Sequence, residues 1–169
     1  MVEIIKESNP DLNKNLFIKE LSKVADGVTL QISRISDAIP SNRNKKEDFI
    51  YIDFEILDEF KAPLILNENT SKENEMIDAT GEIIAIPFTL NESDSTGNYL
   101  ISRNKNIFNI LNYAMKEKKM IPENNSSSIK CNYDEIKTAL TDLKFKATGV
   151  LVNSKDFNNY YRLEVKKGE

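Results

Sequence analysis

Apolar and polar residues alternate along four stretches of the chain, which is the pattern of strands that bury one face. The alternation is clearest over 50–56, and it also predicts strands over 28–32, 143–152 and 160–166. A fifth strand is predicted over 82–90, where a turn and a short return strand at 99–101 would complete a hairpin.

The same alternation predicts which side chains of these strands face outward. Over 50–56 they are Tyr51, Asp53 and Glu55. Over 143–152, the residues Phe145, Ala147, Gly149 and Leu151 are expected to face inward, opposite Lys144 and Lys146. In the last strand the residues expected to face outward are Tyr160, Arg162, Glu164 and Lys166.

A central helix is predicted over 103–117, because the apolar residues there recur with the 3.6-residue period of a helix. They form one stripe, made of Ile107, Phe108, Leu111, Ala114 and Met115. Arg103 and Lys105 then fall in the first helical turn, where the helix dipole disfavours positive charge. Cations at this place bring no evident structural gain, so we interpret them as a functional signal: they suit a phosphate bound at the helix N-terminus.

Two further helices are predicted from their capping residues. One begins at Asn9-Pro10 and ends before Gly27. The other is short and follows Asn132, whose spacing to Glu135 is that of a capping box. Two polar segments predict loops, 67–80 and 121–128, and we expect the first to be mobile because it contains too few apolar residues to pack.

The predicted elements follow the order helix, three strands, helix, short helix, two strands. Three strands, a helix and two strands is the order of the OB-fold, a five-stranded Greek-key barrel. We therefore predict a mainly β, α+β chain: an OB-like five-stranded barrel with a helix between strands three and four and another helix at the N-terminus. With 169 residues it should form a single domain, with 1–27 as a helical extension, 28–166 as the barrel and 67–80 as the mobile loop.

The composition excludes several function classes. The chain has no histidine and one cysteine, which rules out Ser-His-Asp and Cys-His catalysis, imidazole zinc sites and an internal disulfide. No apolar stretch approaches the ~18 residues of a membrane-spanning helix, and a secretory signal pattern is missing. We expect a soluble, cytoplasmic protein with no membrane partner and no cofactor.

Charge is distributed unevenly along the chain. Residues 1–100 carry 10 Lys+Arg and 19 Asp+Glu, whereas residues 101–169 carry 13 and 8, and the whole chain has a net charge of −4. This asymmetry suggests an anionic partner for the C-terminal part, and leaves room for a protein partner at the acidic N-terminal half.

Two passages resemble parts of small OB-fold proteins encoded by phages and archaeal mobile elements. The first is LISRNKNIFNILNYAM, in which a strand would run into a helix through Leu100, Asn104, Lys105, Phe108 and Leu111. The second, DLKFKATGVLV, resembles the fourth strand of that group, although it lacks the glycine of the group's Leu-Gly-Lys-like phrase. The resemblance implies single-stranded DNA binding in DNA replication or repair.

Single-stranded nucleic acid is bound by positive grooves with aromatic platforms, and an OB-fold places such a groove on strands two and three and on the loops between strands 1–2 and 4–5. We therefore predict non-catalytic binding of single-stranded DNA or RNA. The predicted cationic residues are Arg43, Lys45, Lys46, Arg103, Lys105, Lys144, Lys146, Lys155 and Arg162, and the predicted stacking residues are Tyr51, Phe157 and Tyr160.

Two alternatives stay open. Asp53 and Glu55 would repel phosphate if they face outward, which favours a protein-interaction or assembly domain. The second alternative is a metal-dependent nuclease, whose acid-x-Lys pattern supplies carboxylates that hold Mg²⁺. Two stretches match this pattern loosely: Asp53 with Glu59-Phe60-Lys61, and Glu164-Val165-Lys166. A P-loop, a glycine-rich dinucleotide turn and paired cysteines are all missing from the sequence.

Overall fold

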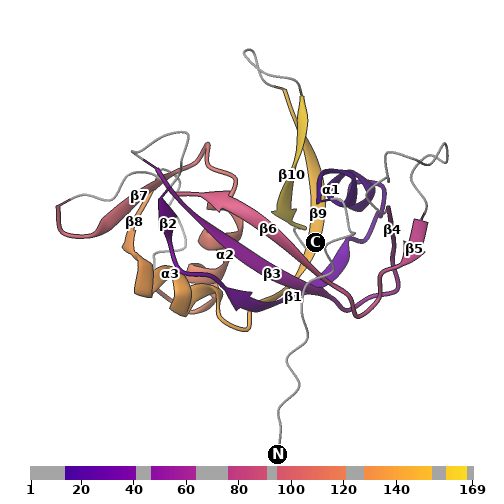
Figure 1. Ribbon diagram of the computed structural model, residues 1–169, viewed down its shortest axis with the longest axis horizontal. Helices are drawn as coiled ribbons and strands as arrows, with labels where there is room; N and C mark the ends of the chain where they lie inside the picture. Colours follow the sequence, from indigo (N-terminus) through magenta and orange to yellow (C-terminus); the bar gives the residue numbers. More distant parts are fainter. Residues whose placement is uncertain are drawn as a thin grey trace, which may run out of the picture. The chain divides into compact units, whose positions relative to one another are not determined.

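The computed structural model describes residues 14–40, 47–63, 76–90, 95–120, 128–153 and 159–166 (Figure 1). The chain is mainly β with helices, which confirms the predicted α+β class. The helices are α1 (Lys14–Leu21), α2 (Phe108–Glu117) and α3 (Tyr133–Leu140). The strands are β1 (Val28–Ile35), β2 (Ile39–Pro40), β3 (Asp48–Ile56), β4 (Lys61–Pro63), β5 (Met76–Asp78), β6 (Ile83–Thr89), β7 (Asn98–Ser102), β8 (Ser128–Asn132), β9 (Lys144–Val152) and β10 (Tyr160–Val165).

The main sheet is antiparallel and strongly curled, a half-barrel with the strand order β10-β9-β1-β3-β6. The two-residue strand β2 adds no sixth position, because it continues β1 along the same side of β3. Ser36, which follows β1, donates its N–H to the Tyr51 carbonyl of β3 at 2.9 Å. Phe49, two residues before Tyr51 on β3, pairs with Ile39 of β2.

A two-stranded sheet of β7 and β8 replaces the hairpin predicted from 82–90 to 99–101. That prediction was wrong: β7 pairs with β8, from Asn98 opposite Asn132 to Ser102 opposite Ser128. Both strands bury alternate residues, Tyr99 and Ile101 in β7 and Ile129 and Cys131 in β8. β8 was missed because it is short and follows directly on a polar stretch that predicts a loop.

The described residues divide into two compact units. Unit 1 takes them from Met1–Gln31, Asp53–Ala85 and Phe145–Glu169, and unit 2 from Ile32–Ile52 and Ile86–Lys144. The division falls inside β1, β3 and β6, so each of these strands contributes to both units. The prediction of a single domain over 1–169 stays a prediction.

In unit 1, helix α1 packs against β10 and β4, and it lies beside β9 and β10 in Figure 1. Phe17 of α1 meets Phe60 edge to face, with ring centroids 5.5 Å apart. A Cβ on Gly149 of β9 would lie 2.1 Å from the Ile18 carbonyl oxygen, so the helix backbone approaches β9 at a place where only glycine fits.

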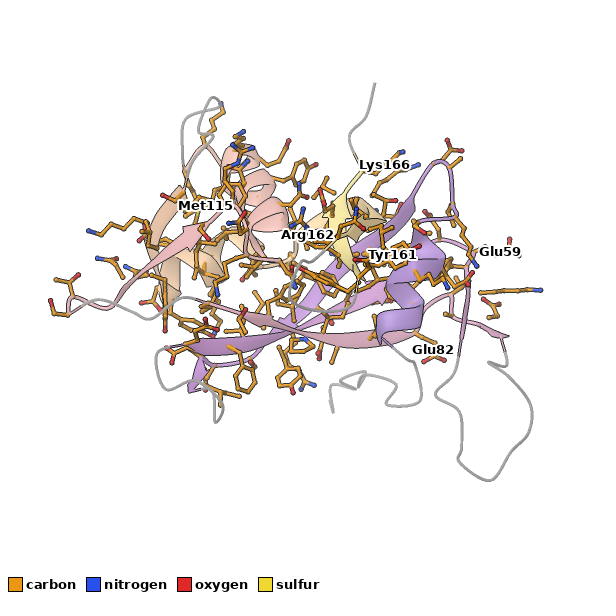
Figure 2. All side chains as sticks on the ribbon, turned by 90° about the horizontal axis from the view of Figure 1, so that it is seen from above. Glu59, Glu82, Met115, Tyr161, Arg162 and Lys166 are labelled. Atoms are coloured by element: carbon orange, nitrogen blue, oxygen red, sulfur yellow. The ribbon has the colours of Figure 1, made fainter. Side chains whose placement is uncertain are left out.

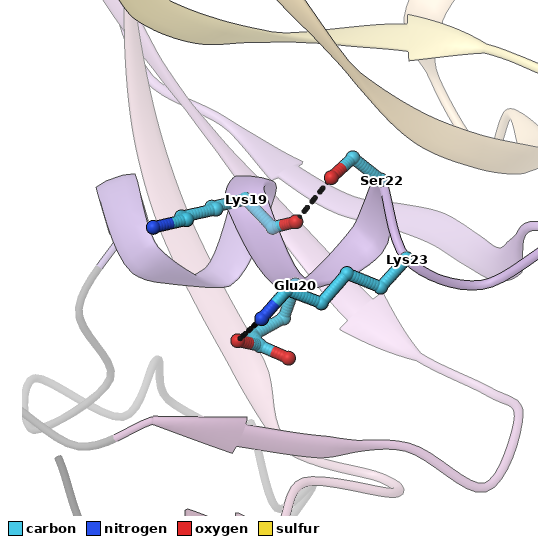
Figure 3. Close-up of polar contacts among 4 residues, drawn as sticks. All are labelled: Lys19, Glu20, Ser22 and Lys23. Carbon is cyan, nitrogen blue, oxygen red and sulfur yellow. Dashed lines mark hydrogen bonds and ion pairs between the residues drawn. The ribbon is translucent and has the colours of Figure 1, made fainter.

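The end of α1 lies earlier than predicted. The helix ends at Leu21, and its last turn is closed by the Ser22 hydroxyl, which donates to the Lys19 carbonyl at 2.5 Å, and by a 2.9 Å ion pair between Lys23 and Glu20 (Figure 3). Gly27 has a φ of +75° but lies beyond the helix, in the turn that leads into β1. The predicted start at Asn9-Pro10 is outside the described residues.

In unit 2, α2 and α3 pack together. The predicted capping box is confirmed: the Glu135 N–H donates to Asn132 Oδ1 at 2.8 Å, and the Asn132 N–H donates to Glu135 Oε1 at 3.1 Å. Helix α2 begins at Phe108, five residues later than predicted. Phe108 itself is only half-buried, and Ile110 takes the place expected for it in the core beside Leu111.

The loop predicted over 67–80 is shorter than expected at its C-terminal end. Met76–Asp78 forms β5, which pairs with β4, and the next residue, Ala79, is buried. Hydrogen bonds from the hydroxyl and the N–H of Thr80, at 2.7 and 3.0 Å, hold the pKa of Asp78 below its ordinary value. Residues 67–75 of this prediction lie outside the described residues.

Candidate nucleic-acid interface

The outward face of β2 and β3 in unit 2 carries three apolar side chains, Ile39, Phe49 and Tyr51, which we call the aromatic face. The rings of Phe49 and Tyr51 meet edge to face with centroids 5.5 Å apart. Ile39 is opposite Phe49 in the strand register, and cross-strand partners share a face. Ile39 is 39% exposed and Tyr51 is 41% exposed, so the sheet presents an apolar, aromatic surface to solvent.

Three hydrogen bonds fix the backbone under this face. The Tyr51 N–H donates to Ser36 Oγ at 2.8 Å, and the Tyr51 carbonyl accepts from the Ser36 N–H. The Tyr133 hydroxyl donates to the Ser36 carbonyl at 2.7 Å. Burial, assisted by Asp37 and Asp134, raises the pKa of Tyr133 above its ordinary value.

Only one member of the aromatic face, Tyr51, was among the predicted site residues. Phe49 stands just before the clear alternation that begins at Ile50, and Ile39 opens a polar connection in the sequence. The signal that would have found them is the spacing of Phe49 two residues before Tyr51, since such residues share one face of a strand.

The prediction that Arg103 and Lys105 occupy the first turn of the central helix was wrong. Both lie in the turns between β7 and α2, and Lys105 precedes the first helical residue by three positions. The Lys105 ammonium lies 3.3 Å from Glu47 Oε1, and Arg103 is exposed. The unfavourable placement of cations on a helix dipole, which suggested function, therefore does not occur.

A second acidic residue beside the aromatic face also has a partner. The Tyr99 hydroxyl donates to Asp48 Oδ2 at 2.5 Å. Burial raises the pKa of Tyr99 to about 12, with a further contribution from the hydrogen bond to Asp48. The two acids that precede Phe49, Glu47 and Asp48, are thus both bound to residues that follow β6 in the chain.

A second candidate surface runs along β9 and β10 in unit 1. Arg162 stands opposite Val150 and Tyr160 opposite Val152, and the Lys166 N–H donates to the Lys146 carbonyl at 2.7 Å. One face of this ladder therefore changes from cationic at Lys146 and Lys166 to apolar at Tyr160. Figure 2 labels Arg162 and Lys166, which belong to this face, and Tyr161, which belongs to the opposite face.

The predicted residues of this ladder differ in their exposure to solvent. Lys144, Lys146 and Tyr160 are exposed, as predicted, and Lys144 belongs to the unit 2 side of the division. Arg162 is half-buried and forms a 2.9 Å ion pair with Glu164. Its guanidinium is therefore partly neutralised.

The apolar end of the ladder, which we call the hairpin arm, consists of Val150–Val152 and Tyr160–Arg162. The prediction that Leu151 faces inward was wrong, because this residue is 49% exposed. Alternate residues of β9 are buried only as far as Gly149, and the next two, Val150 and Leu151, are exposed although they lie on opposite faces.

Asp53 was predicted to face outward and this was wrong: it is buried, with 6% of its surface exposed, while Glu55 is half-buried. Ile52, Asp53 and Phe54 are all buried, so β3 is covered on both faces at this point. Asp53 therefore does not repel a ligand from the surface in the way the sequence suggested. Among the described residues, no group of three or more acidic or cysteine side chains is placed to hold a metal ion.

Five predicted site residues lie outside the described residues. Arg43, Lys45 and Lys46 fall between β2 and β3 in the chain, and Lys155 and Phe157 fall between β9 and β10. In the part of the chain that the structure describes, none of the helices has the length and apolar character needed to cross a membrane.

No protein family, curated protein or solved structure shows a significant match to the chain. The resemblance to small OB-fold proteins of phages and archaeal mobile elements stays a prediction.

Proposed function

We propose that the protein binds single-stranded nucleic acid without catalysing a reaction, and that bases stack on the aromatic face. The observation that carries the proposal is the edge-to-face pair of half-buried Phe49 and exposed Tyr51, with exposed Ile39 opposite Phe49. Apolar side chains on an outward sheet face gain stability only when something covers them, and an exposed aromatic platform suits a nucleobase. Stacking on such a platform contributes ~1–3 kcal/mol per base and tolerates any base.

We infer further that the fold is OB-like. The strand order β10-β9-β1-β3-β6 supports this, because the first strand of the sequence lies between the second and the fourth, as a Greek-key barrel requires. Helix α2 falls between β6 and β9 in the chain, the place expected for the helix between strands three and four. β6 and β10 stand at the two ends of the order, and they are the strands that closure of a five-stranded barrel would bring together.

We propose phosphate contacts in each unit separately, some from residues near the aromatic face in the sequence and some from β9. Arg43, Lys45 and Lys46 directly precede Glu47 and the aromatic face in the chain, and Arg103 is exposed in the turns after β7. Lys144 and Lys146 supply exposed ammonium groups on β9. The proposal is one of sequence-tolerant binding, with a place in DNA replication or repair of a phage or mobile element as the biological setting.

Truncation of the platform tests this function. Tyr51→Ala and Phe49→Ala should each weaken binding to oligo-dT, measured by fluorescence anisotropy, by about 5- to 100-fold, which corresponds to the loss of one stacking contact. The slope of log affinity against log salt should stay unchanged, because neither residue neutralises a phosphate.

Leu100→Ala is the matched control, because Leu100 is an exposed apolar residue of β7 outside the aromatic face. It should bind oligo-dT like the wild type. A wild-type protein at micromolar concentration and low salt that shows no saturable binding would refute the proposed function.

The second candidate function is a protein-interaction or assembly domain. The hairpin arm favours it, because Val150 and Leu151 are exposed aliphatic residues on opposite faces of β9, which a protein partner could cover together with the exposed ring of Tyr160. A protein partner that covers this arm would make Leu151→Asp disruptive for assembly, while oligo-dT binding by the same variant stays unchanged.

A further inference from the structure

The start of β3 is tied down by two polar contacts from a distant part of the chain. Glu47 Oε1 lies 3.3 Å from the Lys105 ammonium, and Asp48 Oδ2 accepts from the Tyr99 hydroxyl at 2.5 Å. The two acids are neighbours, and both partners come from β7 and the turn that follows it. Phe49, the first ring of the aromatic face, is the next residue after this pair of contacts.

The Lys105 side chain is poorly placed to bind a phosphate. Only 19% of it is exposed, and its ammonium already has a carboxylate partner whose own side chain is 31% exposed. A phosphate at Lys105 would compete with Glu47 for the ammonium. Salt screens a partly buried pair of this kind less than it screens a pair in open solvent.

The strand start is held on its backbone as well. The Asp48 carbonyl accepts from the Leu90 N–H at 2.7 Å, and Asp48 pairs with Pro40 of β2. Because the Asp48 carbonyl is directed to Leu90, its pair with Pro40 is a position where β2 and β3 exchange no hydrogen bond. The side-chain contacts of Glu47 and Asp48 add to this backbone bond at the strand end.

We infer that Lys105 and Tyr99 are positioning residues of the aromatic face. Their contacts with Glu47 and Asp48 hold the first residues of β3 in place, so that Phe49 and Tyr51 stay side by side and face outward. This inference rests on the proposed function for its effect on binding. If only the ordered strand end accepts bases, the apparent affinity falls in proportion to the fraction of molecules that keep it ordered.

The sign of one substitution separates positioning from simple electrostatics. Glu47→Gln removes a negative charge next to a site for a polyanion, so electrostatics alone predicts tighter binding. Positioning predicts the reverse. Both Glu47→Gln and Lys105→Gln should weaken oligo-dT binding alike, by about two- to fivefold, because either change breaks the same ion pair.

A second readout needs no nucleic acid. The Tyr51 N–H, which donates to Ser36 Oγ, should exchange with solvent deuterium faster in Glu47→Gln, Lys105→Gln and Tyr99→Phe. Lys105→Arg keeps the ion pair and should restore both wild-type exchange and wild-type affinity. Glu117→Gln and Lys137→Gln are the matched controls, because they make the same charge changes at exposed residues of α2 and α3.

The outcomes distinguish the inference from the function on which it rests. Tighter binding by Glu47→Gln with unchanged Tyr51 exchange would overturn it, and would make Lys105 a phosphate ligand that Glu47 holds back. If the wild type does not bind oligo-dT, the proposed function fails, and exchange alone decides: faster exchange in the two Gln variants supports positioning, and unchanged exchange overturns it.

Discussion

The aromatic face and the hairpin arm both expose apolar residues on strands, but they are fixed in different ways. The aromatic face is held by polar contacts, since Ser36, Glu47 and Asp48 all bind residues from other elements. The strand that leads into the arm is held by packing, since the Ile18 carbonyl approaches Gly149 too closely for a side chain. A platform for stacking needs rings in fixed positions, which the first arrangement provides. The arm is exposed on both faces, which suits a partner that wraps around it.

The packing under the arm is where we expect the largest effect. Gly149→Ala should lower the free energy of unfolding by about 3 kcal/mol, the upper part of the range for overpacked sites, because a backbone carbonyl cannot turn aside as a side chain can. Thermal unfolding monitored by circular dichroism measures it.

If the two regions are fixed independently, Gly149→Ala at a temperature where the protein is still folded should bind oligo-dT with wild-type affinity. Gly97→Ala is the control for the loss of a glycine without a steric clash. A Cβ at Gly97 meets no atom within 4 Å, so only the backbone φ of +85° disfavours alanine there. A Gly149→Ala variant as stable as the wild type would mean that α1 does not dock at this position.

Alkaline pH should lower the free energy of unfolding through two buried groups of unit 2, by less than Gly149→Ala does. Burial raises the pKa of Cys131 from 9.0 to about 12, and that of Tyr99 from 10.0 to about 12. The folded protein thus holds protons that the unfolded chain loses first, so stability is complete below pH 9 and falls as the pH rises towards 12. We expect a loss of roughly 1–2 kcal/mol by pH 10.

Chemical denaturation at pH 8 and pH 10 checks this expectation. Cys131→Ala should remove most of the pH dependence between those values, because its thiol has the lower unperturbed pKa of the two groups. An unfolding free energy that stays constant from pH 8 to pH 10 would contradict it.

The smallest effect concerns the cationic part of β9. Replacing Lys144 and Lys146 together by Gln should reduce the slope of log affinity against log salt by about 1.4, or ~0.7 per phosphate contact on a single strand. Tyr51→Ala should weaken binding without changing that slope, which sharpens the contrast between the two regions. If the double variant keeps the wild-type slope, β9 is not a phosphate-binding surface.

Local patterns in the sequence predicted most strands and the capping box, because each depends on residues a few positions apart. Ile50, Ile52 and Phe54 are buried as their alternation predicts, and Asn132 caps α3 as its spacing to Glu135 predicts. Lys144 and Lys146 are exposed on β9 for the same reason.

The errors arise where distant segments meet. Alternation cannot reveal that β3 is covered on both faces at Asp53, or that β7 pairs with a strand about thirty residues further on instead of with its neighbour. The sequence alone gives no structural reason for Lys105, because its ion-pair partner Glu47 lies 58 residues earlier in the chain. Of the aromatic face the sequence predicted Tyr51 alone, because the positions of Ile39 and Phe49 depend on strand pairing, and a nucleic-acid site stays a prediction.

The packing of α1 against β10 has a consequence for biosynthesis. The helix begins at Lys14 and the strand ends at Val165, so unit 1 joins the first and the last described elements of the chain. During synthesis from the N-terminus, α1 can pack against β4 early, but its packing against β10 must wait until that strand has left the ribosome. The core segments of unit 2 emerge earlier, and contacts at such large sequence separation form slowly. Docking of α1 on β10 is therefore a late step of folding, although Phe17 can meet Phe60 before it.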